Sequence, residues 1–555
     1  MHRRLWLAVT MLVTGASLLV AASLASASGS AHVLKKGGIW REGATGSSSH
    51  ADPQVAYDTL SWALEYATAA KLYNYPDKSG PAGSKLVPEV ASGFKVSNGG
   101  RTYAFTVRKG FRFSDGKPVT AANFKYAINR TANKQLGSPG ASFITDPAGT
   151  NIVGAQAVNA GSANNVSGVR VKGRKLIIHL TKPDGTFMAK ITMPFFQATP
   201  LTLPLQNEVT KGYPAAGPYY YARNDVDRLT SLRLNKFYKK GPGRTRPHNL
   251  AGFDLQWNLN EETAFNQTLA GQLDEFGVPP AQVAATRKRF GVNKTRYWVE
   301  PVNCTGYLPM NNARPLFGGN VKLRKAVNYA VNRKDYVEQA GLDAGAPWTA
   351  LLNPGVPGWT KQRLYPLTPQ ISKARALAKG HFKSGKVNIY YRSSGSTGPA
   401  QYQIVRRDLI QLGFKSGDIS AKGFSGTDIY DAVGKRGNDA DIATGMGWCS
   451  DYPDPYDWMN KLFAGNTIQA ENNDNWSYLN NAVVNRKLNA AAQKTGAKRI
   501  KTYSKLAVWL VKNVAPIVPE RTYNNRYIFS SRVNPKSFVY QGIYQDYDIA
   551  AMALK

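Results

Sequence analysis

Cysteine, histidine and acidic residues are all scarce in this chain. Its 555 residues include 2 Cys and 6 His, and 35 Asp and Glu stand against 71 Lys and Arg, for a formal net charge of +36. No two histidines have the spacing of metal ligands, so a locally built zinc or haem site is not expected. A G-x-S-x-G elbow is absent and no phosphate-binding loop fits the sequence. We therefore expect no enzyme, no cofactor and no metal.

Long hydrophobic runs are missing beyond the N-terminus. Segment 1–27 combines a basic start, an apolar stretch and a small-residue site ending at Ala27, which is the pattern of an export signal. The alternative is an uncleaved membrane anchor. Because the first cysteine is Cys304, a lipid anchor on a cysteine just after the signal is excluded. We expect an exported protein in the periplasm or elsewhere in the cell envelope, outside the cytoplasmic membrane and not lipid-anchored.

The positive charge is dispersed along the chain rather than clustered. Dispersion and export both argue against nucleic acid as a partner. Outside a cell, a basic surface favours electrostatic contact with anionic membrane lipid or anionic wall polymer.

Strand and helix patterns alternate along the chain, as in an α/β protein of more than one lobe. Tyr103, Phe105 and Val107 alternate with polar residues as in a strand, and Thr120 suits a helix N-cap. A hairpin is expected with Lys172–Gly173 at its turn.

Later segments favour helices. A helix should end near Gly271, and the apolar spacing after Asn320 predicts one helix that Gly341 stops. A strand, a small-residue loop and an amphipathic helix are expected over 387–414, and a last helix should end before Pro516.

Several segments, in this order, resemble the family 5 extracellular solute-binding proteins, the oligopeptide- and dipeptide-binding class that serves ABC importers. The strongest is "YAFTVRKGFRFSDGKPVTAANFKYAINR", and the others are "AAGPYYY", "LNKFYKKGPG", "LAGQLDEFG" and "LRKAVNYAVNRKDYV". Two positions depart from the family pattern: Ala216 stands where Thr is usual and Asn332 where Asp is usual.

The resemblance implies an α/β, periplasmic-binding-protein-like, two-lobed hinge fold (type II, class C) with an extra inserted lobe. Carried onto this sequence, lobe I takes 28–75, 195–300 and 516–555. Lobe II takes 76–194 and lobe III takes 301–515.

Two further segments, "EPVNCTGYLPMN" and "GWCSDY", resemble the cysteine-bearing segments of the oligopeptide-binding branch. There the two cysteines form a disulfide, so the resemblance implies a bond between Cys304 and Cys449. An exported protein with two cysteines is oxidised more often than not. The alternative is a pair of buried free thiols.

The resemblance makes Asp451 the residue that takes the amine of the ligand. A buried ammonium needs a carboxylate partner, and the neighbouring rings of Trp448 and Tyr452 would lower the local dielectric and strengthen the pair. The alternative is that Asp451 is a turn residue that caps local N–H groups.

Further ligand-binding candidates are less specific. Tyr307 belongs to the first cysteine-bearing segment. Trp476 would line a pocket or pack in the core, and Arg392 would face a ligand carboxylate or lie on the surface. Loops 43–53, 390–399 and 471–478 are candidates for backbone contacts to an extended peptide.

The sequence thus predicts the extracytoplasmic solute-binding component of an ABC importer. It would bind small peptides, deliver them to the importer's membrane subunits and act as a monomer. The alternatives are the same fold with a nickel chelate, haem or oligosaccharide, a basic wall-associated adhesion or scaffold protein, and a secreted hydrolase.

Overall fold

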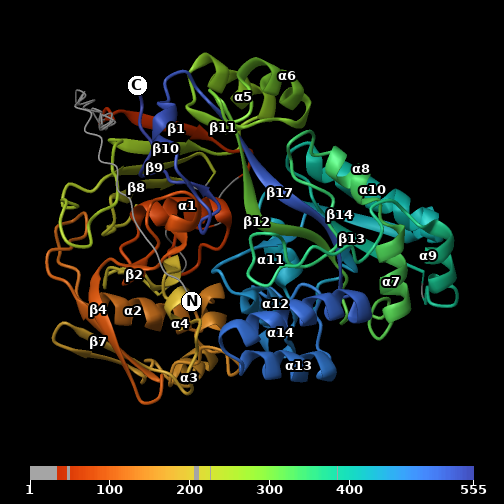
Figure 1. Ribbon diagram of the computed structural model, residues 1–555, viewed down its shortest axis with the longest axis horizontal. Helices are drawn as coiled ribbons and strands as arrows, with labels where there is room; N and C mark the ends of the chain where they lie inside the picture. The colour runs from red at the N-terminus through yellow and green to blue at the C-terminus, as the bar shows by residue number, and fades with distance from the viewer. Residues whose placement is uncertain (1–33, 47–49, 206–211, 226, 384) are drawn as a thin grey trace, which may run out of the picture.

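A computed structural model describes residues 34–46, 50–205, 212–225, 227–383 and 385–555 (Figure 1). The predicted export signal, 1–27, lies outside these ranges. Within them, no helix has the length and apolar character needed to cross a bilayer.

The largest sheet has eight strands in the order β16-β12-β17-β11-β1-β10-β9-β8. Their bounds are β1 Ile39–Gly43, β8 Tyr219–Asp225, β9 Leu229–Leu234, β10 Gly252–Gln256, β11 Glu275–Gly277, β12 Tyr297–Pro309, β16 Gly447–Cys449 and β17 Ile517–Phe529. The two longest strands, β12 and β17, pair antiparallel from Tyr297↔Ile528 to Pro309↔Ile517. In Figure 1 they run from the upper part of the molecule into the part that holds β13 and β14. One sheet therefore ties the two parts together.

A second sheet has four antiparallel strands in the order β4-β5-β7-β6. Its strands are β4 Ala91–Ser97, β5 Thr102–Val107, β6 Val169–Lys172 and β7 Lys175–His179. The strand predicted from Tyr103, Phe105 and Val107 is confirmed, and all three residues are buried. The β6–β7 turn lies at Gly173–Arg174, one position later than expected, and Gly173 has a φ of 56°.

Helix α2 (Ala121–Ala132) covers the inner face of this sheet. It begins at Thr120, whose side chain forms the predicted cap as half of a capping box with Asn123. Its buried side packs into an aromatic-rich core with Phe105, Leu176 and Ile178.

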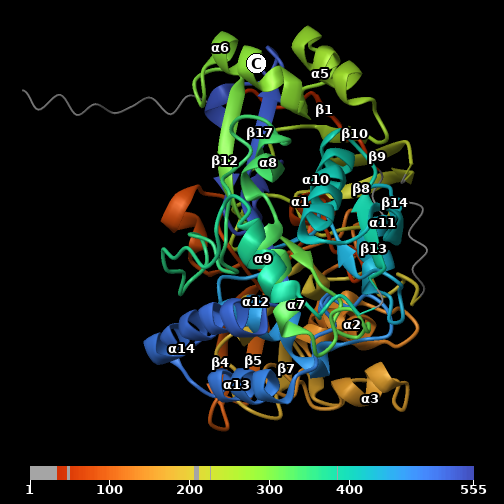
Figure 2. The ribbon, with the colours of Figure 1, turned by 90° about the vertical axis from the view of Figure 1, so that its right-hand side faces the viewer.

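A third sheet, in the order β14-β13-β15, is parallel and lies among helices (Figure 2). Its strands are β13 Val387–Arg392, β14 Ile419–Phe424 and β15 Ile442–Ala443. The helices α9 (Ile371–Ala378) and α10 (Thr397–Leu412) pack with it in one core. The predicted order of strand, loop and helix over 387–414 is confirmed.

The single helix predicted after Asn320 is wrong, because the chain forms α7 (Val321–Ala330) and α8 (Arg333–Glu338). Val331 is extended, and Asn332 caps α8. The guanidinium of Arg333 is fully buried and donates hydrogen bonds to the carbonyl oxygens of Asn328 and Pro519. An uninterrupted helix would not place Arg333 beside these acceptors.

The remaining α-helices are α1 Thr59–Thr68, α3 Ala155–Ala160, α4 Phe187–Lys190, α5 Glu261–Ala270, α6 Val283–Phe290, α11 Asp428–Gly434, α12 Pro455–Phe463, α13 Ala482–Ala492 and α14 Gly496–Trp509. Short strand pairs are β2 Tyr73–Asn74 with β3 Val87–Pro88 and β18 Tyr540–Gln541 with β19 Asp546–Tyr547. Gly271 ends α5 in the left-handed conformation, as predicted. A π-helix, Leu510–Val514, continues from α14 and ends before Pro516, as expected.

Candidate functional site

The two cysteines hold β16 against β12. Cys304 and Cys449 are directly opposite in the antiparallel register, with Cα atoms 4.0 Å apart, and their sulfurs are bonded. The pairing implied by the sequence resemblance is therefore present in the structure, and the described residues include no free cysteine. The bond links positions 145 residues apart, so it closes a long loop.

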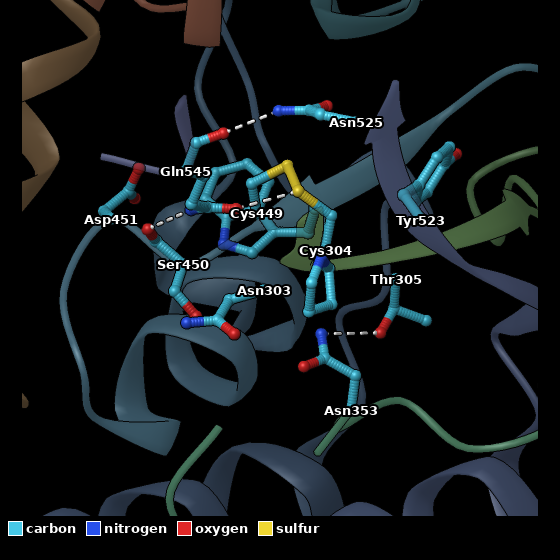
Figure 3. The surroundings of a disulfide bond; sticks show 12 residues. Asn303, Cys304, Thr305, Asn353, Cys449, Ser450, Asp451, Tyr523, Asn525 and Gln545 are labelled. Carbon is cyan, nitrogen blue, oxygen red and sulfur yellow. Dashed lines mark hydrogen bonds between the residues drawn. A yellow bond between two sulfur atoms is a disulfide. The ribbon is translucent and has the colours of Figure 1, made fainter. Parts of the chain in front are cut away.

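The chain after Cys449 is fixed at several points (Figure 3). Ser450 donates its N–H to the carbonyl of Asn303 (3.0 Å), and its own carbonyl accepts from the side chain of Gln545 (2.7 Å). Its hydroxyl accepts from the indole N–H of Trp458 (2.8 Å). These bonds present the next residue, Asp451, on the side away from the disulfide (Figure 3).

Asp451 is buried, with 8% of its surface exposed. Its Oδ2 accepts a hydrogen bond from the hydroxyl of Tyr57 (2.6 Å), 394 residues away in sequence. Burial raises the pKa of Asp451 to about 6, although the neighbouring Asp457, the Tyr57 hydroxyl and Lys461 oppose the shift. Asp451 is therefore a carboxylate held by a distant residue.

Local capping in this loop is carried out by two other aspartates. Asp454 accepts from the N–H of Tyr456 at the start of α12 (2.8 Å). Asp457 accepts from the N–H of Asp451 (2.9 Å) and the indole N–H of Trp448 (3.3 Å). Burial and the adjacent Asp451 raise the pKa of Asp457 well above its usual range. These contacts weaken the alternative in which Asp451 itself is the capping residue.

A cavity of about 360 Å³ opens beside Asp451. It is lined by the residues that follow β1, the start of α1, the end of β13, the start of α11, β16 and the segments 472–476 and 543–545. Its polar and aromatic wall includes His50, Tyr57, Asp58, Trp62, Trp257, Arg392, Tyr430, Asp431, Trp448, Asp451, Asp474, Trp476 and Tyr544.

Four of the six predicted ligand-binding residues line this cavity, namely Trp448, Asp451, Arg392 and Trp476. Tyr307 and Tyr452 are not among its lining residues. Tyr307 packs against Trp476 in the core beneath the wall, with ring centroids 6.1 Å apart. Tyr452 is 1% exposed and packs in another core, where its ring centroid lies 6.3 Å from that of Phe143. Contact of these six residues with a ligand stays a prediction.

All three predicted loops contribute to the wall. Ala44, Gly46 and His50 come from 43–53, Arg392 and Ser394 from 390–399, and 472–474 with Trp476 from 471–478. Residues 47–49 lie outside the described part of the chain.

Sequence reasoning missed the buried pair of Lys461 and Asp474. Their charged groups are 2.7 Å apart, and the ammonium lies 4.3 Å from the ring centre of Phe143 and 5.6 Å from that of Tyr57. Burial raises the pKa of Asp474, and Lys461 opposes that shift. Because Lys461 neutralises Asp474, the net negative charge at this end of the cavity comes from Asp451.

A row of rings connects Asp451 with Arg392. The centroid distances are 6.0 Å from Tyr57 to Trp448, 5.9 Å from Trp448 to Trp476 and 5.4 Å from Trp476 to Tyr430. Arg392 then donates a hydrogen bond to the Tyr430 hydroxyl (2.8 Å), and its guanidinium lies 5.2 Å from that ring centre. Tyr57 and Tyr430 were not predicted.

Among the described residues, no group of His, Cys, Asp and Glu side chains could hold a metal ion. The arrangement offers a walled cavity with a carboxylate near one group of rings and a guanidinium near another. Such a site suits the binding of a polar ligand.

Comparison with known proteins gives the class of the molecule. The model of the bacterial extracellular solute-binding proteins, family 5 middle, matches residues 85–470. The chain is 24% identical over 446 residues to a probable deoxycholate-binding periplasmic protein of Escherichia coli K12, covering 78% of this chain and 79% of that one. It is 23% identical over 470 residues to haem-binding protein A of Haemophilus influenzae, covering 82% of each.

The fold is shared with solved structures. An oligopeptide-binding protein of clavulanic acid biosynthesis superposes with a TM-score of 0.77 at 22% identity, covering 94% of this chain and 96% of that one. This likeness confirms the two-lobed α/β fold of periplasmic binding proteins that was expected from the sequence. Members of the matched family bind and transport solutes rather than catalyse reactions. The chain belongs to the family 5 bacterial extracellular solute-binding proteins.

Proposed function

We propose that this protein captures short peptides outside the cytoplasmic membrane and delivers them to the membrane subunits of an ABC importer. The observation that carries the proposal is the carboxylate of Asp451 at the wall of an aromatic cavity. A peptide ammonium needs such a partner when it leaves water, and a partly buried charge pair gains strength from the low local dielectric.

Arg392 supplies the complementary charge for the other end of a peptide. It lies at the end of the ring row that begins at Tyr57, and it forms no ion pair with any residue in the described part of the chain. Because an extended peptide advances by about 3.3 Å per residue, the three centroid distances of 5.4–6.0 Å along the ring row accommodate at most about five residues. The rings would cover the peptide backbone, and the backbone of the three loops would supply hydrogen bonds.

The charge of the wall favours peptides over the solutes named for the two curated relatives. Four aspartates line the cavity, at positions 58, 431, 451 and 474. With Asp474 neutralised by Lys461, three remain against Arg392 and His50. Haem and deoxycholate both carry carboxylates, which this wall would repel. A zwitterionic or cationic ligand matches it better.

The contacts around the cavity indicate a closed arrangement. With the predicted boundaries, Tyr57 and Asp451 connect lobes I and III, and Asn472 donates to the carbonyl of Gly137 (2.9 Å) between lobes III and II. At the surface, Ser396 donates to Glu261 (3.2 Å) between lobes III and I. We propose that ligand stabilises this closed form and that the importer recognises it. The lobe boundaries and the monomeric state belong to this proposal.

Calorimetry with a tripeptide in free and N-acetylated forms tests the proposal, together with small-angle scattering of the protein with and without that peptide. We expect the free peptide to bind, the acetylated form to bind weakly and the radius of gyration to fall on binding. Absence of binding by a broad peptide mixture, with tight binding of an anionic non-peptide solute, would refute it. Appearance of cleaved peptide would favour a hydrolase.

A further inference from the structure

The four-stranded sheet β4-β5-β7-β6 has one covered face and one open face. On the covered face, Phe105, Leu176 and Ile178 pack against α2. Strand alternation places residues 95, 104, 177 and 170 in one row on the other face, since these four positions are register partners. Figure 1 shows β4 and β7 at the edge of the molecule with α2 on their inner side. The outer face is therefore a free surface.

That open face carries four exposed basic residues, Lys95, Arg170, Lys172 and Lys175. Lys172 and Lys175 are register partners, and Lys175 also pairs with Thr106, so a second cationic row lies beside the first. In the first row, Ala104 and Ile177 lie between Lys95 and Arg170, and the side chain of Ile177 is half-buried. Exposed Arg101 and Arg174 lie just outside strands β5 and β7.

No carboxylate balances these charges. Residues 90–114 and 147–183, which include all four strands, contain no Asp or Glu. None of the four basic side chains forms an ion pair with any described residue within 4.0 Å. Ion pairs between arginine and aspartate do occur elsewhere in the described part of the molecule, as in Arg233–Asp254 and Arg314–Asp441.

We propose that the open face of the β4–β7 sheet docks the protein onto an anionic phospholipid surface. Four cations spread over neighbouring strands about 4.8 Å apart present a broad basic area, which matches a plane of phosphate groups better than it matches a single small anion. The exposed position lets all four approach lipid headgroups without conformational change. Because the face and the cavity are built from different strands, the contact leaves the ligand site accessible.

The test is sedimentation of the purified protein with vesicles of phosphatidylglycerol and phosphatidylcholine in a ratio of about 1:3, against pure phosphatidylcholine. We expect binding to the anionic vesicles only, and loss of that binding as salt rises from about 0.05 to 0.5 M. The variant K95Q/R170Q/K172Q/K175Q should bind about 600-fold more weakly, since each of the four basic residues near such a surface contributes about fivefold. Its fold is checked by circular dichroism and by unchanged peptide affinity.

The matched control removes four exposed lysines from helix α14 and its end, in the variant K498Q/K501Q/K505Q/K512Q. It has the same net charge as the sheet variant. Both variants keep the same N-terminal segment, so any contribution of that segment to vesicle binding is equal in the two. We expect the control to lose less than about threefold. Equal losses in the two variants would show a general charge effect and overturn the proposal. Binding that requires the importer's membrane subunits in the vesicle would also overturn it, because the face would then recognise protein.

Discussion

The cavity wall and the outer face of the β4–β7 sheet carry opposite charges in the same basic protein. Aspartates outnumber basic groups at the cavity, whereas the sheet face has no acidic residue at all. The sheet cations are exposed and keep their hydration, so placing them costs little. The cavity carboxylates are partly or fully removed from water, which is unfavourable unless each has a partner. A carboxylate kept at such a position is stronger evidence of function than an exposed lysine.

The two regions also differ in what secures them. Asp451 depends on a disulfide, on α12 and on Tyr57. The sheet cations depend only on strand alternation. Substitutions in the cavity should therefore have large effects on peptide affinity. Substitutions on the sheet face should weaken vesicle binding by a similar factor for each charge removed.

The largest effect is expected from Asp451→Asn. This change keeps the shape and removes the charge that pairs with the peptide ammonium, so affinity should fall by about 30- to 1,000-fold, or about 2–4 kcal/mol. Calorimetry with free and N-acetylated forms of one peptide measures this loss of affinity. The acetylated form has no ammonium, so its weak affinity should be nearly the same for the parent protein and D451N. Asp428→Asn, an exposed change of equal charge on α11, is the control. Equal affinity of parent and D451N for the free peptide would reduce Asp451 to a structural role.

The next effect is a pH dependence that separates the two regions. Burial raises the pKa of Asp451 to about 6, so the carboxylate is lost as pH falls through that value. At pH 5 roughly a tenth remains ionised, and peptide affinity should be about tenfold lower than at pH 7. Vesicle binding, which uses lysine and arginine, should not weaken over the same range. A peptide affinity independent of pH would contradict the assignment of the ammonium partner.

A smaller effect is expected from the charge of the ligand. Tripeptides of the form Ala-X-Ala with X as Lys, Gln or Glu should bind in that order, with steps of about fivefold, because the wall is net negative and partly screened. Competition against one fluorescent peptide gives the ranking. The reverse order would show that Arg392 and His50 dominate the field in the cavity.

The smallest effect is expected from salt on peptide binding. A pair enclosed by rings is shielded from mobile ions, so raising salt from about 0.05 to 0.5 M should change peptide affinity by less than about threefold. Vesicle binding should disappear over the same range. If both activities fell together, the cavity would be more open to solvent than its wall indicates, or the protein would be the adhesion protein considered from sequence.

The parts of the site that lie close together in sequence were predictable, and those made by distant contacts were not. Local segments such as "WCSDY" pointed to Asp451, Cys449 and Trp448, and small-residue loops pointed to three stretches of the wall. Tyr57 reaches Asp451 across 394 residues, and Lys461 depends on Phe143 and Asp474, so no local pattern could show either contact. Tyr307 and Tyr452 pack in cores outside the cavity lining, since an aromatic next to a motif fits a core as well as a cavity.

For the fold, too, local features were predictable from the sequence and features set by tertiary contacts were not. Strand alternation at Tyr103–Val107 and the cap at Thr120 are local signals, and both predictions are confirmed. The break between α7 and α8 depends on the burial of Arg333 against Pro519, a tertiary contact that overrides helical spacing.

The most direct test of the central claim is mass spectrometry of the small molecules that the purified protein releases on denaturation. We predict peptides of at most about five residues with free amino termini, present in about equimolar amount with the protein and largely missing from D451N prepared in parallel. Release of haem, a bile acid, an oligosaccharide or a metal chelate instead, unchanged in D451N, would contradict the claim that this cavity binds peptides through Asp451.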